Sequence, residues 1–326
     1  MEVKKVLTKK RIKIAEIKSD AGKLGEETVA VLPKNLEVMF AGKLCNMLIK
    51  SRVASENIMW SYVEKYLQVP KDLIDKMRKT ANPIKKLEEY CTAQNVSWSV
   101  FENLLNLQHE FGESFTNFKD KVTKIVSKDV LYQKFDPIKG FTAYQMALLI
   151  SMIKDISKFD TPSNLMVYSG LACIHGMPVT KANINKIREI YLAQGKEFAG
   201  FNTILGGRMY VITDCLLRSR GYFFDLYNKI RTRLHEKAIN EKRVEDKDGK
   251  LYMIGKKNQS LIIYTHTGAK RRIARVLLHL IWTEWRKLEG LSIRIPYPIE
   301  YLGHKHEITL EEVVAFETSK NGQAKK

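Results

Sequence analysis

The segment 136–171 constrains the fold most strongly, because its apolar residues repeat with a helical period. They recur at steps of three and four residues, at Met146, Leu149, Ile150 and Ile153. This spacing predicts a helix with a buried face. After a break at 155–161, Pro162 indicates the first turn of a second short helix over 163–168, which ends before Gly170. The segment is therefore predicted to form a helix, a short loop and a helix.

A turn at Lys139 and Gly140 precedes the first of these helices. Backbone N–H groups that point outward at a helix N-terminus commonly hold a phosphate. Helix pairs with a glycine turn also occur in many folds that bind no phosphate. Lys139 and Gly140 are therefore a hypothesis for nucleic-acid binding, with a purely structural turn as the alternative.

Helical periods continue on both sides of this segment and predict a mainly α, multi-helical fold. Residues 35–128 carry three apolar stripes, interpreted as core packing because aromatic stripes at helical spacing are mostly buried. The stripes are Leu36, Met39, Phe40, Leu44, Met47 and Leu48, then Ile58, Trp60, Tyr62, Val63, Tyr66 and Leu67, then Phe111, Phe115, Phe118, Val122, Ile125 and Val126. Towards the other end, Asp248 and Gly249 predict the turn of a small β-hairpin inserted near 244–264.

The excess of positive charge on the chain limits the class of molecule that it is expected to bind. The chain has 55 Lys and Arg against 36 Asp and Glu, a formal net charge of +19. An excess of this size predicts attraction to a polyanion, and nucleic acid is the commonest one. The Lys-rich surface of a thermophilic protein is the alternative, although such surfaces normally carry nearly matching Glu.

Cysteine spacing and hydropathy exclude several other classes. The four cysteines are scattered without close pairs, which predicts neither a zinc site nor a disulfide framework. The Lys-rich N-terminus lacks the apolar core of a secretory signal, and no stretch reaches the roughly 18 apolar residues of a membrane span. These features predict an intracellular protein, nucleoid-associated in the cytoplasm or carried in a virion, with no membrane partner, metal or cofactor. A homo-oligomer is left open.

Two basic helical faces in the C-terminal half are candidate phosphate tracks. One lies on a helix predicted over 222–239 and consists of Lys229, Arg231 and Arg233. The other lies on the closing helix, predicted over 267–289. Its basic residues are Lys270, Arg271, Arg272, Arg275 and His279. Basic side chains near a helix N-terminus add charge to unpaired backbone donors and can clamp a phosphate. A solvated face is the alternative for both helices.

Several phrases resemble the C-terminal domain of the bridge-RNA-guided insertion-sequence transposases, in their archaeal form. The phrases are KGF, LLISMIKDISKF and LMVYSGL, then GKEFAGFN and THTGAKRRIARVLLHLIWTEWRKLEGL. The family's pattern of a glycine turn, an isoleucine-aspartate-isoleucine phrase, a phenylalanine and a tyrosine-x-glycine-leucine falls on Gly140, Ile153, Asp155, Ile156, Phe159, Tyr168, Gly170 and Leu171. The resemblance covers about residues 130–305.

The resemblance also implies catalytic parts that this sequence lacks. The family has a DEDD nuclease-like N-terminal half, yet no strand-like apolar run ends in Asp before residue 130. Active members carry a nucleophilic serine after the glycine-leucine phrase, yet no serine occurs between Leu171 and Arg218. Cys173, His175 and Thr180 are the nearest polar side chains to that position, and Cys173 is interpreted as a small buried cysteine. No catalytic residue is therefore assigned, and enzyme activity is not expected.

These observations divide the chain into a basic arm over 1–25, a helical N-terminal domain over 26–130, a transposase-like helical domain over 131–305, and a C-terminal helix and tail over 306–326. The favoured function is nucleic-acid binding, with DNA ahead of RNA, by a non-catalytic relative of a transposase. One alternative is an active DNA recombinase with a non-standard or partner-supplied nucleophile. A second is a helical structural or interaction protein of a thermophilic virus or host.

Overall fold

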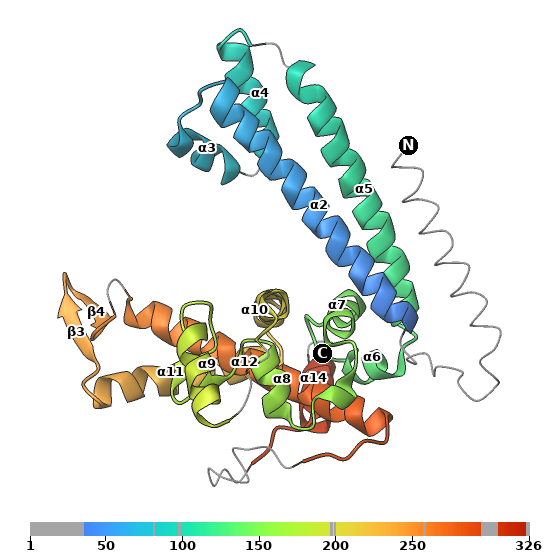
Figure 1. The fold of residues 1–326 in the computed structure, drawn as a ribbon, viewed down its shortest axis with the longest axis vertical. Helices are drawn as coiled ribbons and strands as arrows, with labels where there is room; N and C mark the ends of the chain where they lie inside the picture. The colour runs from blue at the N-terminus through green and yellow to red at the C-terminus, as the bar shows by residue number, and fades with distance from the viewer. Residues whose placement is uncertain are drawn as a thin grey trace, which may run out of the picture. The chain divides into compact units, whose positions relative to one another are not determined.

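Helices make up most of the chain in the computed structural model, which describes residues 36–80, 82–96, 99–195, 198, 200–256, 259–294 and 306–323 (Figure 1). The structure is 70% helical, with twelve α-helices and two small two-stranded antiparallel sheets in this part of the chain. The predicted mainly α fold with a small hairpin is therefore confirmed. Within the same residues, none of the helices is both long and apolar enough to cross a membrane.

Helix α7 (Ala143–Ile153) is the most buried element, and every residue in it except Tyr144 is buried. Thr142 and Gln145 form a capping box at its start: the Gln145 N–H donates to Thr142 Oγ1, and the Thr142 N–H donates to Gln145 Oε1. The predicted buried stripe is confirmed. Burial extends around the whole helix because neighbouring helices cover all its sides.

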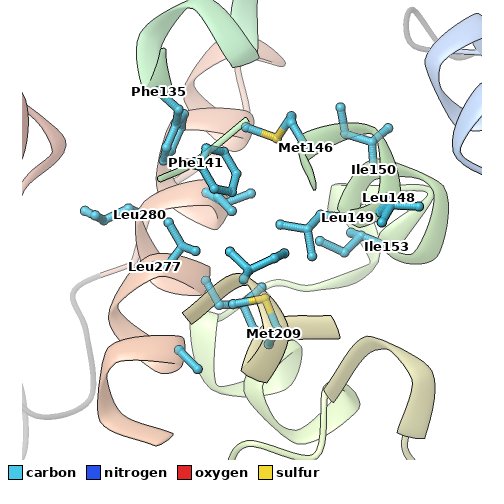
Figure 2. Close-up of a cluster of buried hydrophobic side chains, with 14 of the residues drawn as sticks. Phe135, Phe141, Met146, Leu148, Leu149, Ile150, Ile153, Met209, Leu277 and Leu280 are labelled. Atoms are coloured by element: carbon cyan, nitrogen blue, oxygen red, sulfur yellow. The ribbon is translucent and has the colours of Figure 1, made fainter. Parts of the chain in front are cut away.

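The main hydrophobic core forms around α7. Figure 2 shows Phe141, Leu149, Met209 and Leu277 converging from separate elements of the chain. From residue 130 onwards, the other helices that contribute buried residues to this core are α6 (Val130–Phe135), α8 (Pro162–Tyr168), α10 (Thr203–Arg218), α11 (Tyr222–Asn240), α12 (Leu261–Leu288) and α14 (Leu310–Gln323). Trp282 and Trp285 of α12 are also buried in it. Helices α11 and α12 pack along one another within this assembly (Figure 1).

The predicted helix, loop and helix of 136–171 is present. The 3₁₀ turn η2 (Ile156–Lys158) follows α7, and α8 begins with Pro162 after its N-cap Thr161. Gly170 has φ of +71° and ends α8 with its backbone in the left-handed region. A hairpin that was not predicted, β1 (Cys173–Ile174) with β2 (Met177–Pro178), precedes α9 (Ile184–Ala193).

The hairpin predicted near 244–264 is present as β3 (Val244–Lys247) and β4 (Lys250–Met253). Asp248 and Gly249 form its two-residue turn, with φ of +51° and +69°. Two positive φ values are the signature of the tight turn that matches strand twist. The hairpin links α11 to α12 (Figure 1).

Four helices precede α6: α2 (Leu36–Tyr66), α3 (Lys71–Arg78), α4 (Pro83–Ala93) and α5 (Ser99–Val126). The far end of α2 joins α3 and α4 in a second hydrophobic cluster, which includes Trp60, Val63, Ile74 and Leu87. The prediction that both α2 stripes are buried is wrong for Phe40, Leu44, Met47, Ile58, Tyr62 and Tyr66, which are 43–71% exposed.

A close backbone approach explains the error in α2. A Cβ atom on Gly42 would collide with the Ala147 carbonyl oxygen of α7, so only small residues fit between the two helices. The buried side of α2 is therefore lined by Ala41, Gly42 and Cys45, and the larger apolar side chains lie beside it.

The predicted domain boundaries stay a prediction. The arm over 1–25 lies outside the described residues. Val38, Ala41 and Cys45 from α2 join Val122 and Val126 from α5 in the main core, so residues on both sides of position 130 share that core.

Candidate nucleic-acid interface

The basic residues predicted on the closing helix lie in the middle of α12, not at its N-terminus. The predicted start at Thr267 is wrong, because α12 begins at Leu261 after the N-cap Ser260, whose side chain accepts the Ile263 N–H. Lys270 is therefore more than two turns inside the helix. Any phosphate bound there would meet side chains and not the unpaired backbone donors of a helix end.

Arg271 is fixed to the loop that follows α8. Its guanidinium donates to the carbonyl oxygens of Leu171 at 3.0 Å, Gly170 at 3.0 Å and Ala172 at 2.7 Å. The left-handed Gly170 turns the chain away from the helix axis and leaves these carbonyls without helical partners. Arg271 therefore holds α8 and β1 against α12, and its donors are largely used.

Lys270 is also paired. Its ammonium lies 2.6 Å from the Asp214 carboxylate of α10 and 5.7 Å from the centre of the Tyr210 ring. The Lys270 side chain is mostly buried, whereas Asp214 is 40% exposed. This ion pair joins α12 to α10 and leaves little free charge at Lys270.

Arg275 and Arg272 differ from these two residues because neither has an ion pair or hydrogen bond among the described residues. Burial lowers the pKa of the Arg275 guanidinium below its usual value, and the like charges of Arg272 and Arg271 lower it further. Cys173 and Tyr210 also lie near Arg275, and they raise its pKa. A partly buried cation surrounded by like charge is unfavourable, and an anion placed beside it would relieve both effects.

Cys173 is exposed, so the interpretation of a small buried cysteine is wrong. The two-residue turn of β1 and β2 carries Cys173 to the protein surface, close to Arg275. His175 and Gly176 form that turn, with φ of +47° and +75°. The error arose because this hairpin was not predicted from the sequence.

His279 does not extend the basic face. Its side chain is buried, its Nε2 lies 2.8 Å from Glu307 Oε1, and its ring stacks on Trp282 with 6.3 Å between centres. The expectation that it lies with Arg271 and Arg275 opposite the apolar side is therefore wrong. Residues 277–282 are all buried, so neighbouring segments cover both faces of α12 at this point.

The three basic residues predicted on α11 divide between two faces. Lys229 and Arg233 are exposed and one helical turn apart, whereas Arg231 is partly buried and lies near His266 of α12. None of the three has an ion pair among the residues described. His266 Nδ1 is 2.6 Å from the Tyr227 hydroxyl. Burial lowers the pKa of His266, and the charges of Lys270 and Arg231 lower it further.

The turn at Lys139 and Gly140 serves packing. The Ser219 hydroxyl donates to the Lys139 carbonyl oxygen at 2.7 Å, and a Cβ atom on Gly140 would come within 2.6 Å of the Cys215 carbonyl oxygen. The capping box already uses the N–H groups of Thr142 and Gln145. This turn therefore packs against the end of α10. These contacts do not include the basic residues of α11 or α12.

The site also includes residues that sequence reasoning missed, namely Tyr210, Asp214, Tyr227 and His266. His266 could have been found, since it lies four residues before Lys270 and shares its helix face. Tyr210 and Asp214 share a face of α10 by the same spacing. Nothing in the sequence indicates that this face lies against α12.

We refer to Arg231, Arg272 and Arg275 as the unpaired arginines. Arg231 and the Lys270–Asp214 ion pair lie near His266, and Arg272 lies near Arg275. In the part of the chain that the structure describes, no three His, Cys, Asp or Glu side chains are grouped to hold a metal ion. No protein-family model, no curated protein and no solved structure matches this chain.

Proposed function

We propose that this protein binds nucleic acid, DNA in preference to RNA, through phosphate contacts from α11 and α12. The observation that carries the proposal is the partly buried Arg275, which has two arginine neighbours and no acidic partner among the described residues. Arginine is well suited to phosphate because its guanidinium presents several donors in a rigid fork. The formal net charge of +19 would add long-range attraction.

Neighbouring residues that are held in place by hydrogen bonds and an ion pair would help the unpaired arginines to bind phosphate. Arg271 is held by three carbonyl oxygens and Lys270 by Asp214, so α8, α10 and α12 are tied together around Arg275. A rigid frame lowers the entropy lost when a ligand binds. Lys229 and Arg233, on the exposed face of α11, would contribute further phosphate contacts at the margin.

The preference for DNA and the evolutionary origin rest on the resemblance described above. We infer a non-catalytic relative of the bridge-RNA-guided transposases, since the sequence carries neither the family's serine nor its acidic nuclease residues. Phosphate contacts alone would bind many sequences with similar affinity.

Salt dependence tests the proposal. If the three unpaired arginines each engage one phosphate, the affinity for duplex DNA should fall about 40-fold between 50 and 200 mM salt, from a slope of about −0.9 per contact. An affinity that does not change with salt would contradict phosphate binding.

A second candidate function, DNA recombination, is favoured by the exposed Cys173 beside Arg275. A cleavage assay on supercoiled and hairpin DNA with Mg²⁺ separates the two. We expect no cleavage by the wild-type protein or by Cys173→Ala. Cleavage that disappears in Cys173→Ala would favour recombination.

A further inference from the structure

A separate cavity of about 300 Å³ lies between α2, α7, α8 and α10, and it shares no residue with the unpaired arginines. Three lysines line it, Lys43, Lys50 and Lys154, and none of the described residues that line it is acidic. None of the three has an ion pair with a described residue. Lys43 makes one contact of a different kind, with its ammonium 5.2 Å from the centre of the Phe40 ring. Three uncompensated positive charges around one cavity favour an anionic ligand.

The backbone of Lys154 is strained. Lys154 follows the last residue of α7 with φ of +67° and ψ of −54°, and the Asp155 N–H donates to the Ile153 carbonyl oxygen at 2.8 Å across it. A three-residue turn of this hand is rare for any residue with a side chain. Glycine would adopt it without strain. Because strained residues cluster at functional sites, the lysine here indicates that its charge is needed at the cavity.

A rigid polar wall faces these lysines. The Asn202 side chain accepts from the Ile204 and Leu205 N–H groups and donates to the Tyr168 hydroxyl at 3.2 Å, which in turn donates to the Met152 carbonyl oxygen at 3.2 Å. Each group is therefore fixed before any ligand arrives. Fixed polar groups orient a small ligand in most binding cavities.

Asn46 adds an unsatisfied acceptor to the same lining. Its Nδ2 donates weakly to Ser151 Oγ at 3.5 Å, while its Oδ1 is buried and accepts no hydrogen bond from the described residues. A buried acceptor without a partner is unfavourable.

Apolar side chains complete the cavity. Met47 and Ile204 line it and are 57% and 42% exposed, and the buried Met152 lies deeper. Methionine adapts its shape well to planar rings. The cavity thus combines cations for a phosphate, fixed polar groups at Asn202 and Tyr168, and apolar surface for a ring.

We propose that this cavity binds a nucleoside phosphate, with the phosphate at Lys43, Lys50 and Lys154 and the base against Met47 and Ile204. A volume of about 300 Å³ is at the lower end of small-molecule sites. The same chemistry is carried by a free nucleotide and by the 5′-phosphate end of a strand. The proposal does not depend on the phosphate contacts of α11 and α12.

Calorimetric titration with adenosine 5′-diphosphate tests the site. We expect saturable binding by the wild-type protein, and an affinity at least tenfold lower in Lys154→Gly. Glycine relieves the strained turn, so this variant should also melt at the same or a higher temperature. Loss of affinity without loss of stability distinguishes a ligand-binding role from a structural one.

Lys242→Gly is the matched control, since Lys242 also has a positive φ, +49°, but lies at the end of α11 and not in the cavity. It should gain stability and keep the wild-type affinity for the diphosphate. Lys43→Gln with Lys50→Gln, at two exposed positions of α2, should lose affinity while remaining folded. No binding by the wild-type protein, or equal affinity in all variants, would overturn the proposal.

Competition by a short oligonucleotide with or without a 5′-phosphate identifies the source. Displacement of the diphosphate only by the phosphorylated strand indicates a strand end, and displacement by neither indicates a free nucleotide. Arg275→Gln should leave diphosphate binding unchanged. If Arg275→Gln loses duplex binding and keeps diphosphate binding, the two proposals are independent. They are also independent if Lys154→Gly loses diphosphate binding and keeps duplex binding.

Discussion

Helices α7 and α2 both carry apolar residues at helical spacing, yet α7 is buried nearly all round and α2 leaves a broad apolar face exposed. The period alone cannot distinguish them, because it reports a helix and not the number of its neighbours. The same distinction holds for charge on α12. Arg271 has three acceptors and Arg275 has none among the described residues, although the two are one helical turn apart. In both cases, contacts with other segments decide what a residue contributes.

The largest expected effect contrasts Leu149 of α7 with Leu44 of α2. Leu149 is fully buried in the main core and Leu44 is 43% exposed. Leu149→Ala should therefore lower the free energy of unfolding by about 2–5 kcal/mol, since it removes buried surface and leaves a cavity. Leu44→Ala should lower it by less than about 1 kcal/mol. Urea unfolding measures both, and equal losses would show that α2 is covered on that face.

The next largest effect on stability distinguishes Arg271 from Arg275 of α12. Arg271→Gln should lower the free energy of unfolding by about 1.5–3 kcal/mol, because it removes charged hydrogen bonds to three carbonyl oxygens. Arg275→Gln removes an unpaired, partly buried charge and should leave stability unchanged or slightly higher. Thermal unfolding distinguishes the two, and a larger loss in Arg275→Gln would mean that Arg275 has a structural partner.

Two glycine-to-alanine substitutions, compared with one another, test the close approach of α2 to α7. Gly42→Ala should lower the free energy of unfolding by about 1–3 kcal/mol, because its Cβ atom meets the Ala147 carbonyl oxygen and Ser151. Gly112→Ala, in α5, meets none of the described residues within 4 Å and should raise stability by roughly 0.5–1 kcal/mol through helix propensity. A neutral Gly42→Ala would show that the two helices are farther apart.

The smallest effect concerns pH. Because burial and the nearby Lys270 and Arg231 lower the pKa of His266, the unfolded chain binds a proton there more readily than the folded chain. Stability should therefore fall as the pH is lowered from 7 towards 5. His266→Gln should flatten that part of the pH profile. A bound phosphate near Arg231 should raise the pKa and strengthen binding at lower pH. An unchanged profile in His266→Gln would exclude this group as the cause.

Local features were the most predictable part of the fold. Pro162, Gly170, and Asp248 with Gly249 each determine backbone geometry within a few residues, and each was predicted correctly from the sequence. The partners of each helix were not predictable, because they depend on segments a hundred or more residues away, as with Arg271 and Gly170. The start of α12 was placed too late because Ser260 lies before an apolar run, Leu261 to Ile263, that was assigned to the hairpin insertion.

The candidate site was also predicted only in part from the sequence. Charge density located α11 and α12, but the ion pair of Lys270 with Asp214, and the burial of His279 beside Glu307, come from tertiary contacts. The cavity at Lys43, Lys50 and Lys154 has no signal in the sequence, since its residues belong to elements that are distant along the chain.

The salt dependence of DNA binding tests the central claim most directly. Fluorescence anisotropy with a labelled duplex between 50 and 200 mM salt gives the slope of log affinity against log salt for three proteins. The wild type should have a slope of about −2.7 or steeper, and Arg231→Gln with Arg275→Gln should be shallower by about 1.8. The matched control, Arg78→Gln with Lys86→Gln, removes the same charge from cations paired to Glu56 and Glu89, and should keep the wild-type slope. A flat wild-type slope, or the same change in both double variants, would contradict phosphate binding at the unpaired arginines.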